Sequence, residues 1–172
     1  RPPRSTLFPY TTLFRSVKLP EAALQREFLL ARQVEQASAR VSAAIGEATR
    51  ILKALASRSA HPNDRIGKHI AALTARISAL SEVQLRPDPR ELTGSPPRRT
   101  DSLRALSVAL DKLERAIDGA DADPGADTLA SYARLSKMVA ATIHEWDQLK
   151  RTELARLNAE LSQAGDQPIP PA

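Results

Sequence analysis

Three histidines are the residues of this chain best suited to bind a metal ion or to move a proton. His144-Glu145 begins like the HExxH helix of zinc metalloproteases, which needs a second histidine one turn later. Gln148 occupies that position, so a solvated helix face is favoured over a zinc site. His61 and His69 flank the start of a predicted helix, but no cluster of carboxylates accompanies them to complete a ligand set. We therefore expect no metal site and no bound cofactor.

Four aspartates spaced along a turn resemble part of a calcium-binding loop. Such a loop needs a glycine at its sharp turn and a bidentate carboxylate at its end. The segment lacks a glycine at the required place, and Tyr132 falls where the final carboxylate would be. A solvated turn whose carboxylates cap the neighbouring helices is therefore favoured over a calcium site. The aspartates are Asp118, Asp121, Asp123 and Asp127.

A cluster of arginines lies in a proline-rich segment and could contact phosphate groups or a nucleic acid. Binding of single strands usually adds aromatic side chains between the basic residues, on which the bases stack. This segment has no aromatic residue. A solvated linker is therefore favoured, and we expect no nucleic-acid partner. The arginines are Arg86, Arg90, Arg98 and Arg99.

Several other kinds of site are excluded by what the chain lacks. It has no cysteine, which excludes thiolate metal sites, disulfides and a cysteine nucleophile. It has no phosphate-binding loop, no GxSxG nucleophile motif and no dinucleotide-binding fingerprint. No apolar run approaches the roughly 20 residues that cross a bilayer. We expect no catalytic activity, no small-molecule substrate and no membrane span.

The first sixteen residues stand apart because they match the translation of a DNA reagent. The string RPPRSTLFPYTTLFRS is what the universal forward adapter of short-read sequencing libraries encodes in one reading frame. We exclude residues 1–16 from fold and function, as tags and fusion scars are excluded. The natural chain is expected to start no earlier than Val17 and to continue a longer protein whose upstream part is missing.

Without residues 1–16 the composition is that of an all-helical protein. These residues carry three arginines and no acid, so the formal net charge falls from +5 to +2. The remaining aromatic residues are Phe28, Tyr132 and Trp146. A core with so few aromatics must be built from Leu, Ile, Val and Ala, which in such chains pack as helix against helix. We predict an all-α fold in a single domain.

Apolar positions three and four residues apart predict helices over residues 20–58, 64–84, 100–119 and 127–163. Pro20 suits the start of the first helix, where a missing N–H costs nothing. Thr100 or Asp101 is expected to cap the third helix, and Gly165 to end the fourth. Residues 85–99 are predicted to be a proline-rich linker, and residues 166–172 a disordered tail. The seam of the first helix comprises Leu24, Ala31, Ser38, Ile45 and Leu52, with Val34, Val41, Ala48 and Leu55.

The helix lengths predict an antiparallel bundle of two long and two short helices. With antiparallel neighbours, both short helices would cover the same upper half of the long pair. That half would be four-helical, with Ile45 and Ile143 in its dry centre. The lower half would be a two-helix hairpin of residues 21–38 against residues 146–163.

The predicted lower hairpin is more apolar than two helices can bury against each other. Leu29 and Leu30 widen the stripe beyond a single seam. Exposed apolar patches of this kind mark contacts with other surfaces. We therefore predict a docking surface there, unless the short helices or the linker reach lower and cover it. Its residues are Leu24, Phe28, Leu30, Val34, Leu154, Leu157 and Leu161.

Three segments together resemble the C-terminal helical region of bacterial proteins whose N-terminal part is a sialidase-like, BNR-repeat or sortilin-like β-propeller, often described as glycosyl hydrolase-like. The resemblance covers nearly all of the natural chain, and it carries over no catalytic residue. Where that family often has Thr-Pro at the start of the last helix, this chain has Gly125-Ala126. The segments are VKLPEAALQREFLLARQV (residues 17–34), AIDGADADPGADTLASYARL (116–135) and LARLNAELSQAG (154–165).

The resemblance implies an exported protein, periplasmic or extracellular, in which this region is a non-catalytic domain docked on its own upstream propeller. Any hydrolase activity would then belong to that upstream domain. The alternative is an autonomous helical interaction module, such as a coiled-coil adaptor or regulator. Such a module would bind a helix of another protein in the same apolar groove.

Overall fold

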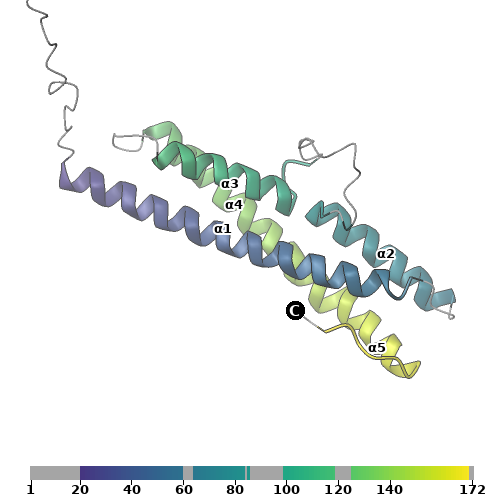
Figure 1. Cartoon of the computed structure of the whole chain (residues 1–172). Helices are drawn as coiled ribbons and strands as arrows, with labels where there is room; N and C mark the ends of the chain where they lie inside the picture. Colours follow the sequence, from purple (N-terminus) through teal and green to yellow (C-terminus); the bar gives the residue numbers. More distant parts are fainter. Residues whose placement is uncertain (1–19, 60–63, 84, 86–98, 119–124, 171–172) are drawn as a thin grey trace, which may run out of the picture.

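The computed structural model describes residues 20–59, 64–83, 85, 99–118 and 125–170, and within these ranges it contains helices and no strand. The helices are α1 (Glu21–Ala56), α2 (Asp64–Ser81), α3 (Leu103–Asp118), α4 (Ala126–Leu149), a π-helical turn η3 (Lys150–Leu154) and α5 (Ala155–Gln163). The prediction of an all-α bundle with two long and two short helices is confirmed (Figure 1). The helix bounds lie within three residues of those expected from the spacing of apolar residues.

The two long helices are α1 and the continuous rod formed by α4, η3 and α5. In α1 the first turn closes on Pro20, whose carbonyl accepts a hydrogen bond from the Ala23 N–H at 2.8 Å. In the rod, Leu149 and Leu154 are five residues apart and both are buried. On a regular α-helix, positions five apart point about 140° away from each other. The π-helical turn between them brings both leucines to the core, which explains its position.

Two side-chain hydrogen bonds define the start of α3. Ser102, rather than Thr100 or Asp101, caps α3: its hydroxyl oxygen accepts a hydrogen bond from the Ala105 N–H at 3.1 Å. The carbonyl of Asp101 accepts a hydrogen bond from the Thr142 hydroxyl at 3.1 Å, which fixes the start of α3 against α4.

The helices form three rods side by side. One rod is α1, and the second is α4, η3 and α5. The second rod runs parallel to α1 (Figure 1), and Trp146 and Lys150 contact Glu47 of α1. The third consists of α2 and α3, which follow one another along α1 and run antiparallel to it (Figure 1). The α3 end of this third rod lies at the start of α1, where Phe28 and Ile117 line one groove. The α2 end lies beside α5, where His69 contacts Glu160.

This arrangement corrects the predicted placement of the short helices on one half of the bundle. Apart from Ala23 in the first turn, the buried residues of α1 extend from Leu30 to Leu55, so its apolar face needs cover along most of its length. At 1.5 Å per residue, α1 is about 54 Å long, and α2 and α3 end to end are about 51 Å. Placed end to end, the short helices cover the apolar face of α1 along its length. Placed side by side, they would leave about half of that face exposed.

The predicted hairpin of residues 21–38 against residues 146–163 is therefore not formed. The first part of α1 lies against α3, and α5 lies against α2 at the other end of the bundle. Ile45 and Ile143, expected in a dry four-helix centre, are only half buried, because three rods enclose a narrower core. The largest fully buried side chains instead include Trp146, Ile51, Leu52, Leu55, Ile70, Leu73, Ile77, Leu103, Leu106, Leu110, Leu154 and Leu157.

The C-terminal tail folds back on α5 as far as the structure describes it, through Pro170, which corrects the expectation of disorder from residue 166 onwards. Gly165 ends the helix as predicted, with a positive φ of 83°, and the Asp166 N–H donates to the Leu161 carbonyl at 2.9 Å. The Asn158 amide then holds Ile169 through two 2.8 Å hydrogen bonds, one to its N–H and one to its carbonyl. Ile169 is buried against the core.

The burial pattern of α3 predicts a sharp contrast between two neighbouring apolar residues. Leu106 is fully buried, whereas Val108 is 37% exposed on the same helix. We expect Leu106→Ala to lower the free energy of unfolding by about 2–5 kcal/mol, because it leaves a cavity in the core. Val108→Ala should change it by no more than about 0.5 kcal/mol. Urea denaturation of both variants checks this, and equal losses would contradict the assigned core face of α3.

The tail contact gives a second stability prediction. Asn158→Ala removes both hydrogen bonds to Ile169, and leaving these backbone groups without partners should cost about 1–3 kcal/mol. We also expect the Ile169 amide to exchange with solvent much faster in this variant, measured by hydrogen exchange. The control is Ser162→Ala, which removes only a bond from an exposed hydroxyl to the Asn158 carbonyl. A tail that stayed protected in Asn158→Ala would contradict the role of this amide.

Candidate docking surface

The predicted docking residues do not form one surface in the structure. Leu154, Leu157 and Leu161 are buried in the core between α5 and the other helices. Leu30 and Val34 are buried too, because α3 covers this part of α1. These five residues are therefore core residues and not part of an exposed docking surface.

Leu24 and Phe28 are exposed as predicted, and they lie at the end of the bundle where α1 begins. Their exposed fractions are 50% and 64%. Leu29, which widened the apolar stripe in the sequence, is 56% exposed beside them. We call this group, Leu24, Phe28 and Leu29, the α1 apolar cluster.

Packing is loose at this same end of the bundle. The helix α4 starts here, and none of its residues is fully buried before Val139. Leu129 is 43% exposed, and Tyr132 is half buried. At its other end the same rod buries Leu154, Leu157 and Leu161. We call the end formed by the start of α1, the end of α3 and the start of α4 the open end.

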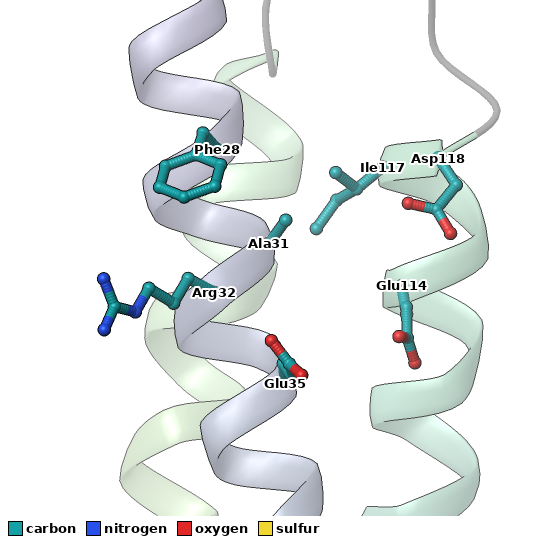
Figure 2. Close-up of a pocket in the computed structure, with 7 residues that line it drawn as sticks. All are labelled: Phe28, Ala31, Arg32, Glu35, Glu114, Ile117 and Asp118. Atoms are coloured by element: carbon teal, nitrogen blue, oxygen red, sulfur yellow. The ribbon is translucent and has the colours of Figure 1, made fainter.

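A groove of about 310 Å³ runs between α1 and α3 at the open end. Positions 28, 31 and 35 lie on one face of α1, and positions 114, 117 and 118 on one face of α3. Figure 2 shows Phe28, Ala31 and Ile117 along the groove, with the guanidinium of Arg32 directed away from α3. We call it the end groove, and its lining is Phe28, Ala31, Arg32, Glu35, Glu114, Ile117 and Asp118.

A second groove of about 340 Å³ lies between α1 and α4. Its apolar part comes from half-buried Tyr132 and Ile143 and from buried Val139. His144 stands at its rim, and the position one turn later is Gln148, so the partial zinc motif of the sequence has no second histidine here. Among the described residues, no three His, Cys, Asp or Glu side chains are grouped so that they could hold a metal ion.

Several other residues considered for chemistry are used in structural contacts or lie outside the described ranges, and Asp118 and Asp127 are exposed. His69 Nδ1 lies 3.0 Å from the Glu160 carboxylate, where Arg65 and Arg156 also approach. The hydrogen bond from His69 lowers the pKa of Glu160 below its ordinary value. Arg99 forms two 2.9 Å bonds to Asp101. The residues outside the described ranges are His61, Arg86, Arg90, Arg98, Asp121 and Asp123.

A half-buried polar cluster joins α1 to the second long rod. The Glu47 carboxylate accepts hydrogen bonds from Trp146 Nε1 at 2.9 Å and from Lys150 Nζ at 2.6 Å. Lys150 also lies 5.5 Å from the centre of the Trp146 ring and 3.2 Å from Asp147. Burial alone would raise the pKa of Glu47, but the two hydrogen bonds outweigh it and hold the pKa below its ordinary value. This cluster ties α1 to the end of α4 and the start of η3.

Comparisons with protein-family models, with curated proteins and with solved structures find no match to this chain. None of the described helices is both long enough and apolar enough to cross a membrane, in agreement with the absence of a predicted span.

The Glu47 cluster predicts a dependence of stability on pH. Because folding lowers the pKa of Glu47, its contribution to stability is complete above the unfolded-state value of about 4.3. It is lost as pH falls through the lower folded-state pKa. We expect the wild type to lose more stability between pH 6 and pH 3 than Glu47→Gln, which does not titrate at that position. Urea denaturation followed by fluorescence of the single tryptophan measures this, and parallel losses in both proteins would contradict it.

Proposed function

We propose that this chain is a non-catalytic helical docking domain that binds another protein surface through its open end. The observation that carries the proposal is the exposure of the α1 apolar cluster at one end of a bundle that is otherwise closed around its core. Burying a leucine or phenylalanine side chain stabilises by about 1.5–3 kcal/mol each. Three exposed side chains of this kind on the first turns of α1 are therefore a substantial driving force for association.

The surface that we propose for this contact is the upstream part of the same polypeptide. The resemblance of residues 17–34, 116–135 and 154–165 to the helical region that follows a β-propeller supports this partner, and an exported propeller protein is the context it implies. The location of the apolar cluster agrees with it, because Leu24 lies near the first described residue, Pro20. A domain that precedes α1 would reach the open end directly.

The second candidate is an autonomous interaction module that binds a helix of another protein. The groove between α1 and α4 favours it, because half-buried Tyr132 and Ile143 would gain cover from a helix placed there. The two candidates differ in which face is covered. The first covers Phe28 at the open end, and the second covers the middle of the α1 and α4 rods.

Substitution of the apolar cluster tests the proposal on the chain itself. We expect Phe28→Ser with Leu29→Ser to reduce the fluorescence of a bound hydrophobic dye severalfold, with helix content unchanged by circular dichroism. Val108→Ser is the matched control, since Val108 is exposed but isolated on α3. Joined to its upstream domain, the chain should show slower hydrogen exchange across residues 24–30, because docking suppresses local opening. Unchanged exchange there, with unchanged dye binding in the double variant, would refute docking at the open end.

A further inference from the structure

The end groove combines an apolar floor with a rim of carboxylates. Phe28 is the most exposed large apolar side chain of the described part of the chain, and it lines the groove from α1 together with Ala31, which points toward α3 (Figure 2). Glu35 on α1 and Glu114 and Asp118 on α3 surround this floor. All three acids are exposed.

The carboxylates of the rim are not neutralised from within the protein. In the described ranges, the side chains of Glu35, Glu114 and Asp118 make no hydrogen bond or ion pair. The one cation in the lining, Arg32, points away from α3 (Figure 2). By contrast, carboxylates at the contacts between other helices are paired: Glu47 with Lys150, Glu153 with Arg76, and Glu160 with His69.

The end of α3 adds to this negative potential. The helix ends at Asp118, and the last carbonyl groups of a helix carry a partial negative charge equivalent to roughly half an elementary charge. Cations are therefore favoured beside Asp118 by both the side chain and the backbone. The net positive charge of the whole chain makes this local excess of negative charge distinctive.

The shape of the groove fits a helix better than an extended strand. Its walls are two antiparallel helices, and no sheet edge occurs among the described residues that could pair with a strand. A third helix laid between two others buries its apolar face in the groove and leaves its flanks at the rim. The flanks of a helix in this groove would meet Glu35 on one side and Glu114 and Asp118 on the other.

We propose that the end groove binds a helical segment with one apolar face flanked by lysine or arginine residues. The inference rests on the proposed docking function, and it adds the charge and secondary structure of the partner segment. Phe28, Ala31 and Ile117 supply the apolar contact, and the three carboxylates select a basic helix over an acidic one. Charge of this kind contributes specificity and association rate more than raw affinity.

Binding of two designed peptides to the full chain tests this inference. Both are amphipathic helices with a leucine face, one flanked by lysines and the other by glutamates, each carrying a fluorescent label for anisotropy. We expect the lysine peptide to bind at least tenfold more tightly than the glutamate peptide at low salt, with the difference shrinking at 0.5 M salt. Glu114→Lys with Asp118→Lys should abolish the preference. Glu145→Lys, a charge reversal at an exposed position of α4 outside the groove, should leave it unchanged.

The outcomes separate this inference from the docking proposal. If both peptides bind equally and Phe28→Ser weakens both, the apolar docking surface stands and the basic partner is refuted. If the lysine preference survives Glu114→Lys with Asp118→Lys, the charge selection lies elsewhere and the inference is likewise refuted. If neither peptide binds, while Phe28→Ser reduces dye binding, the groove is not a helix site and the inference fails alone. Loss of the preference only in the rim variant supports it.

Discussion

The structure depends on one constraint, the continuous apolar face of α1. This face is buried from Leu30 to Leu55, over most of a helix about 54 Å long. Such a face is not stable in water. On one side it is covered by the second long rod, chiefly through α4. The third side is closed by α2 and α3, each half as long, placed one after the other. The order of the rods, their directions and the position of the open end all follow from the way α2 and α3 share one side of α1.

The two ends of the bundle differ because α2 covers one end of α1 and α3 covers the other. At one end α2 packs beside α5, the tail folds back, and Asn158 ties Ile169 to the core. At the other end α3 stops at Asp118 and α4 buries no residue fully before Val139. The cover therefore ends before the apolar residues of α1 do, and Leu24, Phe28 and Leu29 stay in contact with solvent. We take this unequal packing to be the basis of the proposed docking function.

Local features of the fold could be predicted from the sequence, and the pairing of its helices could not. Apolar periodicity located each helix, and Gly165 marked the end of the last one, because these signals depend on neighbouring residues alone. Whether the short helices lie side by side or end to end depends on contacts between distant segments. The summed length of α2 and α3, about 51 Å, nearly equals the length of α1, about 54 Å, and this match indicates the end-to-end arrangement. The five-residue spacing of Leu149 and Leu154 likewise indicates the π-helical turn, because a regular α-helix would not place both on the core face.

The candidate site was predicted in part for the same reason. Exposure of Leu24 and Phe28 followed from an apolar stripe too wide for one partner helix. Leu154, Leu157 and Leu161 were assigned to that surface only because the wrong helices had been paired. The rim residues Glu35, Glu114 and Asp118 come from two helices about 80 residues apart in the chain. No local sequence pattern predicts that they lie together.

The distances between spin labels would test this arrangement most directly. The chain has no cysteine, so pairs of cysteines can be introduced at exposed sites and labelled without background. With one label at Gln25 and the other at Asp118, the three-rod bundle predicts a distance of roughly 15–25 Å, the separation of neighbouring helices plus the label arms. With labels at Gln25 and Gln163 it predicts about 50 Å or more, because these positions lie at opposite ends of the bundle. A short distance between Gln25 and Gln163, with a long one between Gln25 and Asp118, would contradict the three-rod bundle and its open end.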